Sequence, residues 1–281
     1  MYPTEWNFNV SESKVKLSRS FMFSFEENFD SHAARTWMLR NWMNAFWMSA
    51  VYLIVIFCGR SLMTKRPRFE LRTPLVIWNL TLAVFSALGA LRTIPEIIFV
   101  LQHHDFYASV CVPIEFFEKT VVMFWSFLFV LSKALEFGDT IFIVLRKQPL
   151  IFLHWFHHSS VLIFAWFTFS EYTSTERWIG VMNYSIHALM YFFYALRALK
   201  VKPPRFVAMV LTIIQILQMI VAFGIYVFVT KYLLQFGLKG CNVSPINIIL
   251  SFSIYISFLY LFVQFFRKSY LSKDTRKSKD Q

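Results

Sequence analysis

Seven stretches of about 20 or more mostly apolar residues follow one another along the chain and leave little sequence outside them. A helix needs about 20 such residues to cross a hydrocarbon core of roughly 30 Å. A hydrophobic fraction of 57% and a mean hydropathy of +0.51 also exceed what a soluble surface requires. The sequence therefore predicts an all-α, polytopic membrane protein, a bundle of seven transmembrane helices. The expected spans are 43–62, 74–98, 118–144, 150–169, 178–199, 206–230 and 246–266.

The net charge of +12 is compatible with nucleic-acid binding, but the positive residues alternate between the two sides of the predicted spans. The first, third and fifth connections and the tail are rich in Lys and Arg, whereas the other connections are poor in them. The positive-inside rule places the rich set in the cytosol. We therefore expect a luminal segment 1–42, a membrane domain 43–266 and a cytosolic basic tail 267–281, with the bilayer as partner and no nucleic acid.

Four residues on the predicted luminal side suggest modifications of an oxidising compartment. Cys111 and Cys241 lie in the second and sixth connections, where a disulfide bridge would join two ends of a helical ring. Two unpaired thiols are the alternative. Asn9 and Asn242 each begin an N-x-Ser sequence, which is a glycosylation acceptor.

The C-terminus carries Lys277 and Lys279, which stand fifth and third from the end. This spacing is typical of cytosolic signals that return membrane proteins to the endoplasmic reticulum. A simple basic tail is the alternative.

Polar side chains recur at helical spacing in four consecutive spans, although ionisable groups are costly inside a bilayer and suggest function. From their distances to the span ends we expect them to converge in the cytosolic half of the membrane, beside an apolar luminal half. For any one of them, a buried ion pair or an interhelical hydrogen bond is the alternative reading. The cluster consists of Lys133, Glu136, Asp139, Thr140, His154, His157, His158, Asn183, His187, Tyr191, Tyr194, Gln215 and Gln218.

Three other protein classes compete for these features. A di-iron desaturase or hydroxylase needs roughly eight histidines in three boxes, but only His154, His157, His158 and His187 lie in the spans. A single metal ion held by these four histidines remains an alternative, although we expect no metal. A seven-helix receptor or transporter is disfavoured because no Asp-Arg-Tyr-like triplet ends the third span and no Asn-Pro-x-x-Tyr run stands in the seventh.

Four ordered motifs carry a family resemblance. They are Lys133-x-x-Glu136-x-x-Asp139-Thr140, the box from Leu153 to His158, the run from Met182 to Tyr191, and Thr212-x-x-Gln215-x-x-Gln218. From about residue 37 to 270 the chain resembles the very-long-chain fatty-acid elongases, most of all the branch acting on saturated and monounsaturated acyl-CoAs of about palmitoyl length.

The resemblance implies a very-long-chain 3-oxoacyl-CoA synthase of the endoplasmic reticulum membrane, whose helical bundle would enclose an acyl-chain tunnel. It would condense acyl-CoA with malonyl-CoA to 3-ketoacyl-CoA, CO2 and CoA, as the first and rate-setting step of the microsomal elongation cycle. No cofactor is expected. A 3-ketoacyl-CoA reductase, a 3-hydroxyacyl-CoA dehydratase and an enoyl-CoA reductase would complete the cycle, and a homo-oligomer is compatible with the sequence.

The predicted roles follow from the chemistry of this reaction. Neither luminal cysteine reaches the cytosolic cluster, so an imidazole is expected to accept the acyl group. We assign this role to His157 with His187 opposite. A ternary complex in which His157 acts only as a base is the alternative. Asp139 and Glu136 are expected to fix histidine tautomers. Lys133 would balance charge or bind substrate, and Asn183 would donate to an oxyanion. The remaining site residues are His154 and His158 in the box, Tyr191, Tyr194, Gln215 and Gln218 as substrate contacts, and Arg146, Arg197 and Lys200 as a rim for CoA phosphates.

Overall fold

A computed structural model describes residues 22–114, 121–237 and 240–272 of the chain. Every regular element in these ranges is a helix, so the all-α prediction is confirmed. In chain order the elements are α2 (Ser24–Glu27), α3 (Ser31–Asn41), α4 (Asn44–Thr64), α5 (Arg72–His103), α6 (Phe106–Cys111), α8 (Val121–Leu135), α9 (Phe137–Leu145), α10 (Phe152–Ser170), α11 (Glu176–Ala198), α12 (Arg205–Phe236), α13 (Pro245–Phe266) and the π-helical turn η2 (Arg267–Leu271).

Five of the predicted spans are found as helices long and apolar enough to cross a membrane. These are α4, α5, α11, α12, and α13 together with η2. The helices α5 and α12 each contain 32 residues, which is about 48 Å of rise and exceeds a hydrocarbon core of roughly 30 Å. Both therefore extend beyond the apolar layer.

The other two predicted spans differ from this pattern. The third is divided at Glu136 into α8 and α9, each too short to cross alone. The fourth is the single helix α10, which has 19 residues and contains three histidines. The structure thus supports a multi-pass membrane protein, while the full count of seven spans stays a prediction.

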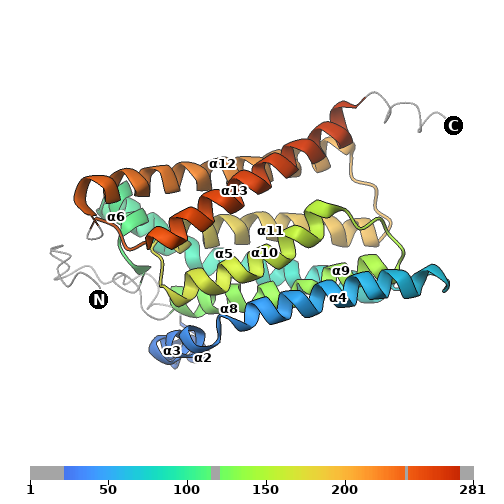
Figure 1. The fold of residues 1–281 in the computed structure, drawn as a ribbon, viewed down its shortest axis with the longest axis horizontal. Helices are drawn as coiled ribbons and strands as arrows, with labels where there is room; N and C mark the ends of the chain where they lie inside the picture. Colours follow the sequence, from blue (N-terminus) through green and yellow to red (C-terminus); the bar gives the residue numbers. More distant parts are fainter. Residues whose placement is uncertain (1–21, 115–120, 238–239, 273–281) are drawn as a thin grey trace.

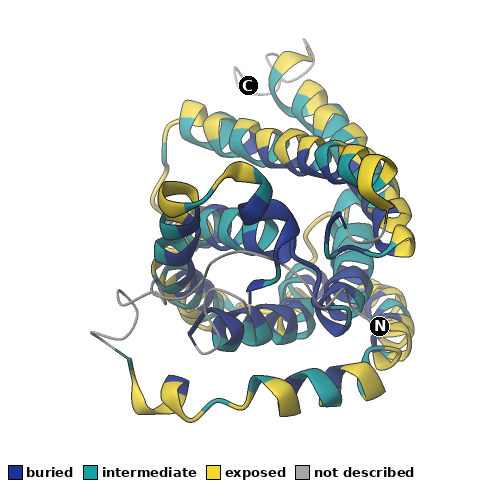
Figure 2. Cartoon of the chain, turned by 90° about the vertical axis from the view of Figure 1, so that its left-hand side faces the viewer, coloured by how far each residue is buried: buried dark blue, intermediate teal, exposed yellow. Residues whose placement is uncertain are grey.

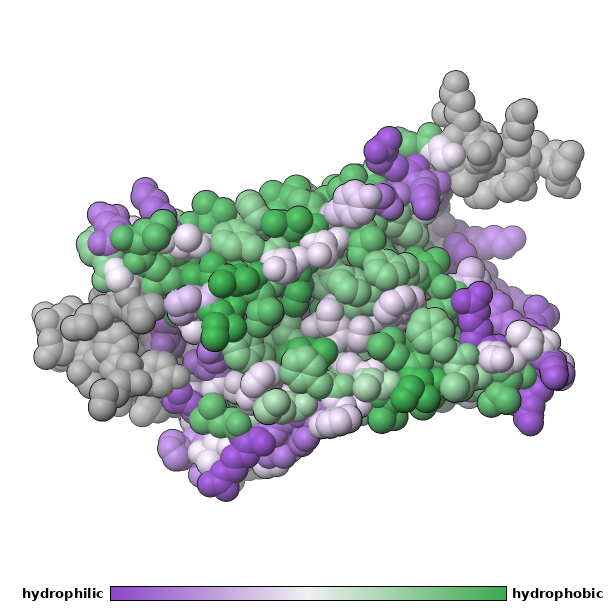
Figure 3. Space-filling model, in the orientation of Figure 1, coloured by the Kyte–Doolittle hydropathy of each residue, from purple (hydrophilic) through white to green (hydrophobic). Residues whose placement is uncertain are grey.

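The long helices run side by side between two ends of the bundle (Figure 1). At the α6 end lie α2, α3, α6 and the turn at 240–244, and at the C-terminal end lie η2 and the connections that follow α4, α9 and α11. Seen from the α6 end, the helices surround a centre toward which their buried faces turn (Figure 2). Hydrophilic residues gather at the two ends, and the face between them is mainly hydrophobic (Figure 3). This surface matches a membrane-embedded belt.

Helices α5 and α11 make the most extensive pair contact in the bundle. Gly89 permits part of it, because a β-carbon at this position would lie 2.4 Å from the ring of Tyr184. The Tyr184 hydroxyl in turn donates to the backbone oxygen of Trp125 on α8, at 2.8 Å. A glycine in one helix thus lets a tyrosine of the second helix reach the third.

The segment before α4 packs on the α6 end instead of extending away from it. Glu26 in α2 is fully buried and accepts hydrogen bonds from Arg92, at 2.6 Å, and from the Trp125 indole, at 2.8 Å. The Tyr172 hydroxyl donates to the backbone oxygen of Ser31, at 2.8 Å. The predicted N-terminal segment 1–42 is therefore attached to the bundle over its described part.

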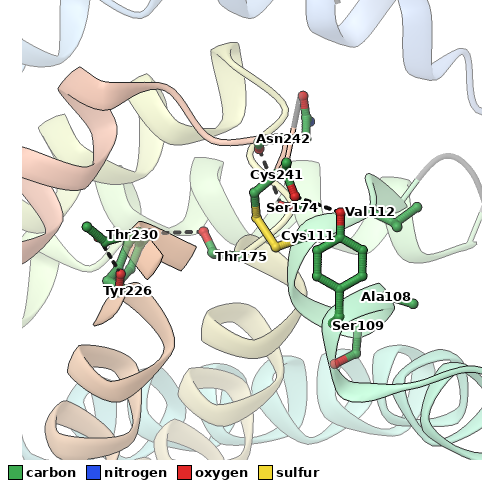
Figure 4. Close-up of a disulfide and its surroundings, with 12 residues drawn as sticks. Ala108, Ser109, Cys111, Val112, Ser174, Thr175, Tyr226, Thr230, Cys241 and Asn242 are labelled. Carbon is green, nitrogen blue, oxygen red and sulfur yellow. Dashed lines mark hydrogen bonds between the residues drawn. A yellow bond between two sulfur atoms is a disulfide. The ribbon is translucent and has the colours of Figure 1, made fainter. Parts of the chain in front are cut away.

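The connections at the α6 end are tied together by a disulfide and an ion pair. Cys111 and Cys241 are bonded, 130 residues apart in sequence, and the backbone N–H of Asn242 donates to the Cys111 oxygen (Figure 4). The Arg177 guanidinium lies 2.9 Å from the Glu96 carboxylate and donates to the backbone oxygen of Ser109 at 2.6 Å. These contacts join α5, α6, α11 and the turn before α13.

Candidate active site

Lys133, near the end of α8, forms the centre of a buried polar group. Its ammonium donates to Glu136 Oε1 at 2.7 Å and to Asn183 Oδ1 at 3.0 Å. Lys133 and Glu136 are each only 3% exposed, and such a buried pair requires good geometry and further hydrogen bonds to offset desolvation. The break between α8 and α9 falls at Glu136, so this acid stands at the helix junction.

The orientation of Asn183 fixes the tautomer of His187. Lysine has no acceptor, so Asn183 must turn its oxygen to Lys133 and its amide N–H to His187 Nε2, 3.2 Å away. Nε2 then accepts, and the ring proton resides on Nδ1, which faces Glu136 Oε1 at 3.7 Å. The predicted association of Glu136 with a histidine thus has a geometric counterpart at His187.

Asp139 on α9 is held by two donors from other helices. Trp78 on α5 donates its indole N–H to Oδ1 at 2.6 Å, and Tyr191 on α11 donates its hydroxyl to Oδ2 at 2.8 Å. His158 Nε2 lies 3.9 Å from Oδ2. Gly138 makes the Trp78 contact possible, because a β-carbon there would lie 2.5 Å from the indole ring.

His154 belongs to a separate polar chain on the α4 side of the bundle. Its Nε2 lies 2.9 Å from the hydroxyl of Thr140, which is 2.7 Å from the Tyr52 hydroxyl on α4. The rings of His154 and His158 are 4.4 Å apart between centroids. Three of the four intramembrane histidines therefore lie beside polar or acidic partners.

His157 is surrounded differently. Its ring packs against Phe258 of α13, with centroids 4.8 Å apart, and lies farther from Phe262, at 6.4 Å. No described residue forms a hydrogen bond with a ring nitrogen of His157, and the side chain lines an internal cavity. A neutral imidazole in this setting has a nitrogen lone pair available for a reacting group.

The cavity has a volume of about 50 Å³ and runs between α8, α10, α11, α12 and α13. His157, Asn183 and Gln218 provide its polar lining nearer the C-terminal end, and Thr168, Glu176 and Tyr226 lie nearer the α6 end. On α10, Thr168 follows His157 by 11 residues, a rise of about 16 Å. Apolar residues line the length between, namely Phe129, Val130, Val161, Phe164, Ala165, Ile179, Met219, Ile254, Tyr255 and Phe258. The arrangement is a polar group at one end of a narrow, mainly apolar cavity. That this cavity is part of the expected acyl-chain tunnel stays a prediction.

Known proteins resemble this chain over most of its length. The sequence profile of the GNS1/SUR4 family, ELO, matches residues 37–278. The chain belongs to this family. It is 50% identical over 273 residues to very long chain fatty acid elongase 6 of Drosophila melanogaster, covering 97% of this chain and 85% of that protein.

Two further relatives are similar over most of their length. Very long chain fatty acid elongase 6 of Gallus gallus is 46% identical over 257 residues, 92% of this chain and 96% of that protein. Very long chain fatty acid elongase 3 of Homo sapiens is 40% identical over 231 residues, 82% and 84% of the two chains. The family predicted from the sequence is thus confirmed.

The remaining predicted substrate contacts of this ELO protein are dispersed. Gln218 lines the cavity, whereas Gln215 donates to the Met190 sulfur at 3.3 Å. Tyr194 is 47% exposed. Arg146, Arg197 and Lys200 lie at the ends of α9 and α11, away from the polar layer, and their contact with CoA stays a prediction.

Within the described ranges, no three His, Cys, Asp or Glu side chains come close enough together to hold a metal ion. The four intramembrane histidines turn to different neighbours, namely Thr140, Asp139, Asn183 and the cavity. This geometry gives no support to the alternative of one metal ion shared by the four histidines.

The other predicted modification sites divide into two groups. The disulfide pair Cys111 and Cys241 is joined in the structure, and Cys58 is a free, exposed cysteine. The Asn242 amide donates to the backbone oxygen of Tyr172 at 2.7 Å, which disfavours a glycan on that nitrogen. Asn9, Lys277 and Lys279 lie outside the described residues.

Sequence reasoning missed Trp78, Gly138 and Glu176. Trp78 and Gly138 stand on different spans, and only the packing of α5 against α9 shows that they meet. Glu176 is the first residue of α11, where an acidic residue usually indicates the boundary of a membrane span. No feature of the sequence indicates that its side chain lines a cavity.

Proposed function

We propose that this chain, a fatty-acid elongase by family, condenses long-chain acyl-CoA with malonyl-CoA through an acyl-enzyme on His157. The observation that supports this assignment is the ring of His157, which lines the cavity without a hydrogen bond to a described residue. His154, His158 and His187 each lie beside a polar or acidic side chain. His157 is therefore the one of these four imidazoles that lines the cavity, where a ring nitrogen is available to a substrate.

The acyl chain occupies the tunnel, and its thioester carbonyl lies at the His157 end. A ring nitrogen of His157 attacks the carbonyl carbon, the carbon–sulfur bond breaks, and CoA leaves as the thiol with the proton from the other ring nitrogen. The product of this half-reaction is an acyl-imidazole, which is as activated as a thioester.

Malonyl-CoA then binds in place of the released CoA. Loss of CO2 leaves the electron pair of the broken carbon–carbon bond as a thioester enolate, whose carbon attacks the acyl group. The bond to the His157 nitrogen breaks, and the ring takes up a proton from solvent in place of the one that left with CoA. The Lys133 ammonium and the remaining Asn183 amide hydrogen are the donors available for negative charge at this end of the cavity.

We propose a membrane topology and a set of partner enzymes for the same reaction. The chain makes seven crossings in the endoplasmic reticulum membrane, with α8 and α9 forming one span, α10 another, and the C-terminal end in the cytosol. Arg146, Arg197 and Lys200 then face CoA phosphates from that side. The 3-ketoacyl product requires two reductions and a dehydration, which partner enzymes supply.

A burst experiment tests the covalent step. Purified enzyme mixed with acyl-CoA alone should release CoA in an amount equal to the enzyme and gain one acyl mass. The variant His157→Ala should lose the burst, the mass gain and the condensation together. His103→Ala, an exposed histidine at the α6 end, is the matched control and should retain all three.

Another result of the same experiment would contradict the covalent step. If normal turnover occurs but no CoA is released before malonyl-CoA is added, His157 acts as a base in a ternary complex. The acyl-enzyme would then be discarded, while fatty-acid elongation itself would stand.

A further inference from the structure

A carboxyl group lies at the far end of the apolar tunnel. Glu176, the first residue of α11, is 6% exposed and lines the cavity at the α6 end. Its Oε1 is buried and has no hydrogen-bond partner among the described residues. An unpaired buried polar atom costs about 1–3 kcal/mol, so this carboxyl favours a ligand that can donate a hydrogen bond.

The other polar side chains at this end are already paired. Tyr226 and Thr175 share a hydrogen bond between their hydroxyls at 2.9 Å, and both are drawn beside the disulfide in Figure 4. The Asn247 amide donates to the Thr168 hydroxyl at 3.1 Å. Glu176 Oε1 is thus the polar atom at this end that is buried without a partner among the described residues.

The position of Glu176 determines which part of a substrate it would meet. The polar group around His157 binds the thioester end of an acyl chain, so the far end holds the terminal carbon. A terminal methyl group would leave the carboxyl oxygen unpaired, whereas a terminal hydroxyl would donate to it. A carboxyl oxygen accepts this bond in either protonation state.

We propose that Glu176 forms a hydrogen-bonding subsite for the ω end of the acyl chain and that the enzyme elongates ω-hydroxyacyl-CoAs. The inference rests on the proposed path of the acyl chain through the tunnel. Because the hydroxyl must reach a fixed carboxyl, the preference is confined to a narrow range of chain lengths.

The test compares kcat/KM for ω-hydroxyacyl-CoAs with kcat/KM for unmodified acyl-CoAs of equal length, over a series of lengths up to and beyond palmitoyl. In the wild-type enzyme the ratio should peak at one length. Glu176→Leu should lower that peak about tenfold. Glu176→Gln retains a carbonyl acceptor and should preserve most of it. Glu171→Gln, which alters a nearby carboxyl that does not line the cavity, is the matched control.

Each outcome has a definite reading. A flat ratio in the wild type, or an equal ratio in the wild type and Glu176→Leu, overturns the subsite and indicates that only water meets the carboxyl. The wild-type length profile decides the matter even if Glu176→Leu does not fold. The path of the chain is tested separately with unmodified acyl-CoA and Ala165→Phe, which narrows the tunnel. If that variant leaves product lengths unchanged, the path is wrong; if products shorten but the ratio is flat, only the subsite is wrong.

Discussion

The indole N–H of Trp78 and the carboxylate of Asp139 are joined across α5 and α9 by a hydrogen bond of 2.6 Å. The second carboxylate oxygen accepts from Tyr191 and faces His158 at 3.9 Å. Trp78 thereby fixes the direction of Asp139 without itself reaching the cavity. We propose that Trp78 acts as a positioning residue for Asp139.

We expect Trp78→Phe to lower kcat about tenfold, because a hydrogen bond to a charged group contributes about 1.5–3 kcal/mol. Asp139→Asn should lower kcat at least as much. The NH2 group of the asparagine would replace one of the two oxygens that accept hydrogen bonds from Trp78 and Tyr191. Trp155→Phe, which alters a tryptophan of α10 that contacts Phe57 and Phe152, is the control. Equal losses in Trp78→Phe and the control would show that the effect is one of packing alone.

Ala165 faces the cavity from α10, two turns beyond His157. We expect Ala165→Phe to shorten the longest acyl-CoA that is elongated, because the larger ring fills tunnel volume. Products would be separated by chain length after incubation with a series of acyl-CoAs. Loss of activity toward every length to the same degree would contradict a steric limit on the chain.

The disulfide gives a simple labelling prediction. Denatured but unreduced protein should react with one equivalent of a thiol probe, at Cys58, and reduced protein with three. In the chain-entropy account a bridge across 130 residues contributes about 5 kcal/mol, and less in a membrane that already confines the unfolded chain. The double variant Cys111→Ser, Cys241→Ser should therefore melt at a lower temperature. Three reactive thiols before reduction would disprove the bridge.

Glu26 should make stability depend on pH. Burial alone raises the pKa of this carboxyl, but hydrogen bonds from Arg92 and Trp125, one from the Phe23 backbone and the Arg92 charge together hold the pKa below its usual value of 4.5. A lowered pKa in the folded state stabilises the fold above the unfolded pKa, and this contribution is lost as pH falls through the folded value. The melting temperature of the wild type should exceed that of Glu26→Gln near neutral pH and converge with it below pH 4.5. The exposed neighbour Glu27 supplies the control, because Glu27→Gln should show no such difference.

Most of the helices were predictable because a membrane-spanning helix requires a long apolar segment, and such segments are evident in the sequence. The division at Glu136 was not predictable, since the residues on both sides of it are apolar enough to continue one helix. Helical spacing placed Lys133 on one face with Glu136, and Asn183 on one face with His187. Depth along the spans predicted that the two pairs share a layer, and the structure brings them within hydrogen-bond or near-contact distance.

Contacts between distant helices could not be derived in the same way. Spacing along one helix gives the face that a residue occupies but not the partner opposite it, so Trp78 and Asp139, 61 residues apart, could not be paired. The same limit applies to Glu176. Its acid side chain is ordinary at the edge of a span, and only packed neighbours reveal that it borders a cavity.

The joined connections at the α6 end have a kinetic consequence. Cys111 is bonded to Cys241 and Arg177 is bound to Glu96, so the described connections beyond Glu176 are cross-linked, and we expect no exit for an acyl chain at this end. An acyl chain that enters from the His157 end must then leave by the same end. It cannot pass through the far end, because the polar CoA attached to it does not fit an apolar tunnel. We therefore expect distributive synthesis, in which each two-carbon addition ends with complete departure of the product before the next acyl group is loaded.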